Sequence, residues 1–146
     1  MNTTGRLTPG SDFILAEQME QLHFPRPWTL AQWQEMATEV HQLYFWKHGE
    51  QTVGFALFGH VKGDETAHLL KICLDPKYRG KGEAEKFWNS LVIHLSTLSI
   101  GKVFLEVEES NVIARNFYKK VGFKIIRSVK EYYTGGESAV MMLLTL

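Results

Sequence analysis

The segment Leu74–Glu85 combines the residue types needed to hold an anion. It contains the end of an apolar strand pattern, a short glycine-containing loop and the start of a helix pattern. Small residues let backbone N–H groups approach a ligand closely, and a helix N-terminus carries a partial positive charge. Four basic side chains add compensating charge: Lys77, Arg79, Lys81 and Lys86. The segment therefore predicts a phosphate-binding loop, with a plain surface turn before a helix as the alternative.

Two spaced motifs in the chain resemble those of a known enzyme family. The loop matches the (Q/R)xxGx(G/A) pattern with which GNAT acyl-CoA-dependent N-acetyltransferases bind pyrophosphate, as Arg79-x-x-Gly82-x-Ala84. A second signature of that family follows at the expected distance, as Asn111-x-x-Ala114-x-x-x-Tyr118-x-x-x-Gly122-Phe123. Together the two motifs are far more specific than either alone. The resemblance implies an acetyltransferase with acetyl-CoA as co-substrate and without a metal.

Under this resemblance, three parts of the chain hold the coenzyme: the loop, the end of the strand before it and the start of a later helix. The strand end is expected to supply backbone groups to the pantetheine amides and one N–H to the thioester oxygen. Asn111 has an equally economical alternative as a plain helix N-cap. The implied cofactor-binding residues are Ile72, Cys73, Leu74, Arg79, Gly80, Lys81, Gly82, Glu83, Ala84, Glu85 and Asn111.

The resemblance also implies two catalytic residues. Glu106 is the expected base, because the attacking amine must be neutral, and Tyr118 is the expected acid for the departing thiol. A modest base suffices for a protein N-terminus, since an α-amino group has a pKa of about 7.7–8.0 against about 10.4 for lysine. Strand alternation places Glu106 on one face with Phe104 and Glu108. The alternatives are a solvent-facing glutamate and a tyrosine that only packs.

Within this superfamily the chain looks most similar to RimI-type enzymes, which acetylate the N-terminal alanine of a ribosomal protein. The similarity rests on the run 105–111, on the aromatic segment 23–28 and on two tyrosines before the last hairpin. It implies that the acceptor binds at Phe24, Trp28, Tyr132 and Tyr133. Because the two tyrosines are expected on a strand, at most one should contact the acceptor. Packing of all four aromatic residues is the alternative.

The expected acceptor is a protein N-terminus, especially one that begins with alanine or serine, and a ribosomal protein is one candidate. Two departures from the RimI-type pattern keep other functions open. The extra Arg26-Pro27 keeps a small amine or polyamine open as the acceptor. The acidic Glu85 in the loop leaves a non-catalytic acyl-CoA-binding regulatory module as a further alternative, against which Glu106 and Tyr118 argue.

Apolar periodicity predicts the elements that position these residues. Asp12 caps a first helix with an apolar stripe of Phe13, Leu15, Ala16, Met19 and Leu22. A capping box at Thr29 and Gln32 starts a second helix that runs to about Val40. Strands are expected at about 42–46, 52–62, 68–74, 102–108, 123–133 and 137–145, with helices at about 82–98 and 111–121. The fold class is α/β (α+β), a mixed and mostly antiparallel central sheet flanked by helices, in the order (β)ααβββαβαββ.

The composition sets further bounds. The 146 residues fit one domain over positions 1–146, and 16 basic residues balance 16 acidic ones, so nothing predicts a nucleic-acid partner. No apolar run reaches the roughly 20 residues of a membrane span, and no secretory signal is expected. The single cysteine excludes an internal disulfide, and the six histidines have no metal-ligand spacing. We expect a cytoplasmic monomer or homodimer that transfers acetyl by direct attack, because Cys73 is more plausible as a buried apolar residue than as a nucleophile.

Overall fold

The computed structural model describes residues 5–24, 26–38 and 40–146. Seven strands form one sheet in the order β1-β2-β3-β4-β5-β7-β6. The elements in chain order are β1 (Gly5–Gly10), α1 (Phe13–His23), α2 (Leu30–Glu35), β2 (His41–His48), β3 (Gln51–Gly59), β4 (Thr66–Leu74), a short 3-10 turn η1 (Pro76–Tyr78), α3 (Glu83–Thr97), β5 (Lys102–Glu108), α4 (Val112–Lys120), β6 (Lys124–Val129) and β7 (Ala139–Thr145). The predicted fold class and element order are confirmed.

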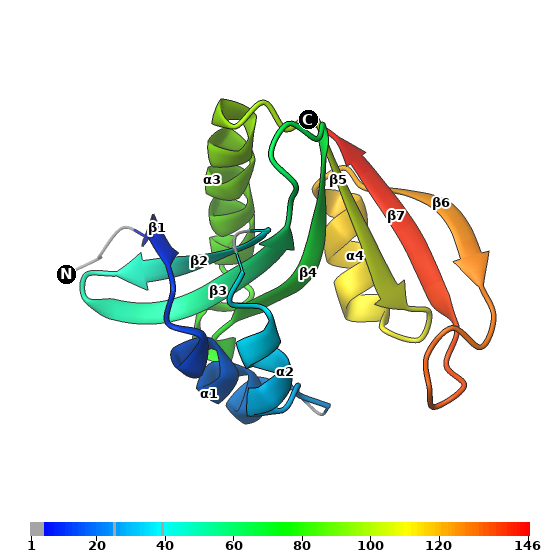
Figure 1. The fold of residues 1–146 in the computed structure, drawn as a ribbon, viewed down its shortest axis with the longest axis horizontal. Coiled ribbons are helices and arrows are strands. Elements are labelled where there is room, and N and C mark those ends of the chain that lie inside the picture. Colours follow the sequence, from blue (N-terminus) through cyan, green and yellow to red (C-terminus); the bar gives the residue numbers. More distant parts are fainter. Residues whose placement is uncertain (1–4, 25, 39) are drawn as a thin grey trace.

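The sheet divides into two halves between β4 and β5. These two strands are parallel, whereas all other neighbours are antiparallel. Their pairing covers only Thr66–His68 with Lys102–Phe104, and the strands then diverge (Figure 1). The sheet therefore opens toward the C-terminal ends of β4 and β5, at Leu74 and Glu108.

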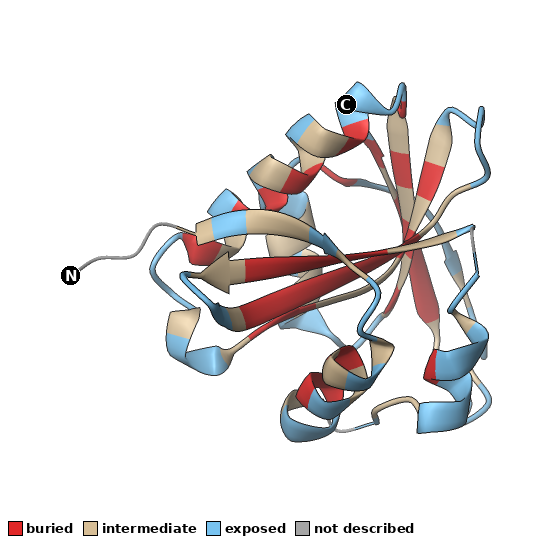
Figure 2. Ribbon diagram, turned by 60° about the vertical axis from the view of Figure 1, so that its left-hand side comes forward, coloured by how far each residue is buried: buried red, intermediate tan, exposed pale blue. Residues whose placement is uncertain are grey.

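Apolar cores cover both faces of the sheet. On one face, α3 and α4 pack through residues such as Phe87, Trp88, Leu91 and Phe117. On the other face, α1 and α2 pack through Ala16, Met19 and Trp33 against Phe45, Phe55, Leu57 and Cys73. The buried stretches of the strands and the inner sides of the helices meet in these layers (Figure 2). The opening between β4 and β5 thus has a different helix pair on each side.

Helix boundaries follow local capping, as the sequence predicts. Asp12 accepts from the N–H of Leu15, and Asn111 accepts from the N–H of Ala114. Thr29 and Gln32 form the expected reciprocal capping box. These bonds satisfy backbone donors that the first turn of a helix leaves free.

Two predicted features of the elements are wrong. The second helix ends at Glu35, because the chain turns at Thr38 and enters β2 at His41 instead of continuing to Val40. Leu22 is exposed, because α1 turns Ala16, Met19 and Glu20 inward instead. The leading strand of the expected order is β1, which covers residues 5–10 and forms by pairing with β2.

The last hairpin is also shorter than predicted. β6 ends at Val129, and Glu131 has a left-handed backbone conformation with φ +51°. Tyr132 and Tyr133 therefore lie in the connection between β6 and β7, not on a strand, and strand alternation does not govern their directions.

Among the described helices, none combines the length and apolar composition required to cross a bilayer.

Candidate active site

The loop before α3 has the backbone geometry of an anion site. Gly80 and Gly82 have φ of +78° and +74°, a left-handed conformation that side chains disfavour. A Cβ built on either residue would meet no protein atom within 4 Å. The first helical bond of α3 runs from the N–H of Lys86 to the carbonyl of Gly82, so it leaves the N–H groups of the preceding turn for another acceptor. The loop therefore fits a pyrophosphate that approaches the backbone closely.

Glu83 contributes to this loop in a way that the sequence did not predict. Its carboxylate points into the fold, where it accepts from Trp46 Nε1 at 2.7 Å and lies 2.5 Å from His48 Nε2. Burial favours a higher pKa for Glu83, but the hydrogen bonds from Trp46 and His48 outweigh burial and lower the pKa. Glu83 is therefore an ionised anchor of the loop, and only its backbone is free to face a ligand.

Two other predicted loop residues have partners within the protein. Arg79 Nε donates to the carbonyl of Leu74 at 3.2 Å, which ties the loop to the end of β4. Glu85 pairs with Lys120 of α4 at 2.7 Å. Lys120 therefore offsets the repulsion that the Glu85 carboxylate would exert on a bound phosphate.

Glu106 lies on β5 just beyond the point where the strands separate. Its Oε2 is 2.7 Å from Nε2 of His68, the last residue of β4 that pairs with β5. Both side chains are partly buried, and His68 also lines an open cavity of about 380 Å³ together with Phe104. Glu106 is thus held in place by a histidine and is not the freely solvated strand glutamate of the alternative hypothesis.

Tyr118 and Tyr133 are close enough to interact electrostatically. Burial raises the pKa of Tyr118 to about 12, with a further contribution from Tyr133. Burial also raises the pKa of Tyr133 to about 12, aided by the negative charges of Glu106 and Glu108. Tyr133 therefore lies within electrostatic range of Glu106 and Tyr118, and Tyr118 keeps its proton at neutral pH. Tyr132 packs edge-on against Tyr133, with ring centroids 5.0 Å apart, and is largely exposed.

Cys73 is buried on the face covered by α1 and α2. Burial raises the pKa of its thiol to about 12, so the thiol stays protonated at neutral pH. A protonated thiol is a poor nucleophile. Ile72, Cys73 and Leu74 lie beyond the last pairing of β4 with β5, so their backbone on that side borders the opening of the sheet.

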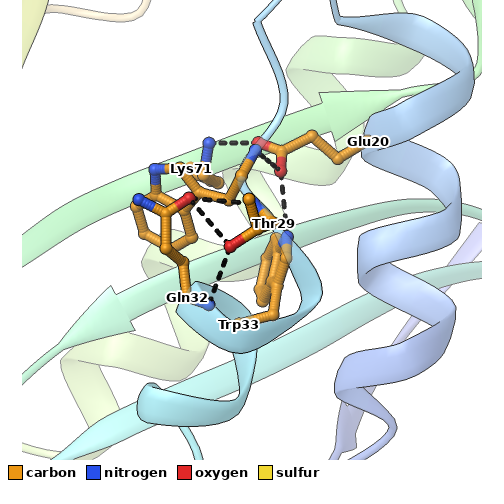
Figure 3. Close-up of polar contacts among 6 residues, drawn as sticks. Glu20, Thr29, Gln32, Trp33 and Lys71 are labelled. Carbon is orange, nitrogen blue, oxygen red and sulfur yellow. Dashed lines mark hydrogen bonds and ion pairs between the residues drawn. The ribbon is translucent and has the colours of Figure 1, made fainter.

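Phe24 and Trp28 lie in the linker between α1 and α2, next to a buried polar cluster. Glu20 Oε1 accepts from the N–H of Trp28 at 2.7 Å and from Trp33 Nε1 at 2.9 Å, and Oε2 contacts the Lys71 ammonium (Figure 3). Lys71 Nζ also lies 4.0 Å from the ring centroid of Trp28 and 5.9 Å from that of Phe24. The two aromatic residues are only partly buried, so each has both a packed and an accessible side.

Comparison with known proteins agrees with this geometry. Residues 12–123 match the Acetyltransferase (GNAT) family. The chain belongs to this family. The GNAT family uses acetyl-CoA, so the predicted enzyme class and acyl donor are confirmed. Among the described residues, no cluster of three or more His, Cys, Asp or Glu side chains is arranged to hold a metal ion, and metal-independent transfer stays a prediction.

Several relatives within the GNAT family are similar to this chain. Ribosomal protein bS18-alanine N-acetyltransferase of Haemophilus influenzae is 30% identical over 135 residues, which cover 90% of each chain. The protein of the same name from Haemophilus ducreyi is 36% identical over 86 residues, which cover 56% of this chain and 59% of that protein. The crystal structure of the ribosomal-protein-S18-alanine N-acetyltransferase from Escherichia coli shares the fold, with a TM-score of 0.86 and 24% identity over 97% of this chain and 94% of that chain.

The site contains residues that the sequence motifs did not reveal. Three residues outside the motifs contact predicted site residues or each other. His68 contacts Glu106, and Lys71 contacts both Glu20 and the ring of Trp28. One signal was available for Glu20: it follows Phe13 and Ala16 at helical spacing, so a carboxylate falls on the apolar face of α1. His68 and Lys71 had no comparable signal, because their partners are distant in the sequence.

Proposed function

We propose that this GNAT enzyme transfers the acetyl group of acetyl-CoA to the α-amine of a protein N-terminus, preferably one beginning with alanine or serine. The observation that carries the proposal is the placement of Glu106 beside the opening of the sheet, with its Oε2 2.7 Å from His68 Nε2. The names of the Haemophilus relatives support an acceptor that begins with alanine, and they suggest a ribosomal protein as that acceptor. A cytoplasmic location stays a prediction from the sequence.

Acetyl-CoA, when bound, supplies the thioester that the amine attacks. The backbone of the Gly80–Glu85 loop would hold its pyrophosphate, and the end of β4 would hold the pantetheine arm. Asn111 caps α4, and its contact with the coenzyme arm stays a prediction. Glu106 takes a proton from the acceptor ammonium, so that the amine can attack. His68 keeps the carboxylate of Glu106 in position through the 2.7 Å contact.

Tyr118 is the proposed proton donor to the departing sulfur. Burial keeps this phenol protonated at neutral pH, so its proton is available to the departing thiolate. Glu106 and Tyr118 would thus act at opposite ends of the transfer, Glu106 on the amine and Tyr118 on the sulfur. General acid–base groups of this kind contribute roughly 10²–10⁴-fold to a rate.

The acceptor is proposed to lie between the α1–α2 linker and the β6–β7 connection. Phe24 and Trp28 would form one wall, and Tyr133 the other, with Tyr132 at the exposed rim. A small primary amine is the second candidate acceptor, because Arg26 forms ion pairs from the linker to Glu108 and Glu137 and so narrows this region.

A substrate panel combined with one variant tests the proposal. Coenzyme A release is measured with peptides that begin with alanine or serine, with lysine peptides blocked at the N-terminus, and with polyamines. Glu106→Gln should lower kcat for the best peptide by roughly 10²-fold or more and leave acetyl-CoA affinity unchanged. Part of that loss should be recovered at high pH, where more of the amine is neutral.

Glu109→Gln is the matched control, because Glu109 is an exposed carboxylate three residues further along the chain. The N-terminal assignment fails if a polyamine has a higher kcat/KM than every alanine or serine peptide. The role of Glu106 fails if both glutamine variants retain wild-type turnover.

A further inference from the structure

Arg26 connects three segments that are far apart in the sequence. Its Nη1 lies 3.2 Å from Glu108 Oε1, at the end of β5, and 2.8 Å from Glu137 Oε1, in the connection between β6 and β7. Arg26 itself belongs to the linker between α1 and α2. A single guanidinium therefore joins the α1–α2 linker to the end of β5 and to the β6–β7 connection.

These ion pairs lie close to the proposed catalytic glutamate. Glu106 and Glu108 are two residues apart on one face of β5, which corresponds to about 6.6 Å along the strand. The carbonyl of Glu137 accepts from the N–H of Tyr133 at 3.0 Å, so Glu137 is fixed to the proposed tyrosine wall. Arg26 stands between Phe24 and Trp28 in sequence, on the opposite wall. The bridge therefore runs from the linker wall to the tyrosine wall at a distance from Glu106 that corresponds to about two residues of an acceptor peptide. An extended peptide advances about 3.3–3.6 Å per residue.

We propose that Arg26 determines specificity by narrowing the acceptor path beyond the second residue of the acceptor. This inference rests on the proposed function. An acceptor of one or two residues reaches Glu106 without disturbing the bridge. A longer peptide has to break the contacts of Arg26 with Glu108 and Glu137 before its third residue can pass.

The burial of the three side chains sets the size of the effect. The Arg26 side chain is 63% exposed, and those of Glu108 and Glu137 are each 29% exposed. Ion pairs this accessible to solvent are weak and are screened by salt. Because a long acceptor has to open the bridge, its kcat/KM in the wild-type enzyme should be about two- to five-fold lower than without the bridge. The bridge selects among acceptors and does not block long ones.

The test compares acceptors of two lengths with variants that change charge in opposite directions. The acceptors are an alanine-initiated dipeptide amide and a hexapeptide with the same first two residues, both with uncharged side chains. Arg26→Gln removes a positive charge and Glu137→Gln removes a negative one, but both break the bridge. Each variant should raise kcat/KM for the hexapeptide about two- to five-fold and leave the dipeptide amide unchanged. Added salt should produce the same selective gain in the wild-type enzyme and a smaller gain in Arg26→Gln.

Glu109→Gln serves as the control for a nearby carboxylate outside the bridge, and it should not change kcat/KM for either acceptor. Opposite effects of Arg26→Gln and Glu137→Gln on the hexapeptide would overturn the inference, because they would indicate general electrostatics. Equal effects on both acceptor lengths would also overturn it, as would wild-type values in both variants. If the wild-type enzyme acetylates neither peptide, the proposed function itself fails, and the inference fails with it.

Discussion

The buried contact between Glu20 and Lys71 allows a quantitative test of how the acceptor side of the fold is held together. The Glu20 side chain is 0% exposed and that of Lys71 is 13% exposed. Glu20 also accepts from the N–H groups of Trp28 and Trp33, so its two oxygens serve three donors (Figure 3). Burial lowers the pKa of Lys71, although the hydrogen bond and charge of Glu20 oppose that shift. The ammonium therefore depends on Glu20 for its stabilisation.

Glu20→Gln preserves the size of the side chain but cannot serve all three donors. If the amide oxygen faces the two tryptophan N–H groups, the amide nitrogen faces the Lys71 ammonium. If the amide is reversed, both N–H groups lose their acceptor. Removing one partner of a buried pair costs about 3–5 kcal/mol. We expect Glu20→Gln to lower the free energy of unfolding by about 3 kcal/mol, near the lower end of this range, because the amide retains some of the hydrogen bonds.

Urea unfolding followed by tryptophan fluorescence and circular dichroism measures this decrease. With a slope of about 2 kcal/mol per molar urea, the midpoint should fall by about 1.5 M. The double variant Glu20→Gln with Lys71→Met should recover part of the loss, because it removes the unpaired ammonium. Glu35→Gln, an exposed glutamate at the end of α2, is the matched control and should stay within about 0.5 kcal/mol of wild type.

The cluster also predicts an effect on catalysis. Because Glu20 holds the N–H of Trp28, Glu20→Gln should raise KM for the acceptor without changing acetyl-CoA affinity. The reasoning is refuted if Glu20→Gln is as stable as Glu35→Gln, or if the double variant is no more stable than Glu20→Gln alone.

Three further predictions concern the coenzyme side of the site and alkaline pH. Tyr118→Phe should lower kcat by roughly 10²-fold, and the defect should shrink with an acyl donor whose thiol has a lower pKa; an equal defect with both donors would contradict the acid role. Gly82→Leu should weaken acetyl-CoA binding at least ten-fold by calorimetry, because the side chain would strain a backbone at φ +74° and fill the space facing the loop; unchanged affinity in a folded variant would contradict the loop assignment. Folding raises the pKa of Tyr118 and Tyr133 from 10.0 to about 12, so their contribution to stability should be complete below pH 10 and should be lost between pH 10 and about 12. Unfolding free energies measured across that range should show a shallower decline in Tyr118→Phe, and an identical decline would contradict the assignment.

Features that depend on neighbouring residues in the chain were predictable from the sequence. The caps at Asp12, Thr29 and Asn111 join residues three positions apart. The loop before α3 also follows from local composition, because its glycines permit the left-handed backbone that brings N–H groups toward an anion. Alternation along β5 correctly placed Glu106 opposite the buried Val103, Leu105 and Val107. The family resemblance extended this local information to the order of the elements.

Where local preference and tertiary contacts disagreed, the tertiary contacts decided the outcome. Tyr132 and Tyr133 are aromatic residues, which favour β-strands, but the left-handed backbone of Glu131 turns the chain before them. Leu22 suits an apolar stripe, yet α1 buries Glu20 instead, because Lys71 and two N–H groups are available to compensate a carboxylate there.

The sequence by itself determined the GNAT architecture, the glycine-containing loop before α3 and the identities of Glu106 and Tyr118 as candidates. Only the tertiary structure decided how these residues are supported. His68 lies 38 residues from Glu106, Lys71 lies 51 from Glu20, and Arg26 lies 111 from Glu137. Contacts over such separations leave no periodic signal, because they form only when the sheet brings distant strands and loops together. The physical reason is that a short-range pattern specifies an element, whereas the environment of a side chain depends on which elements pack around it.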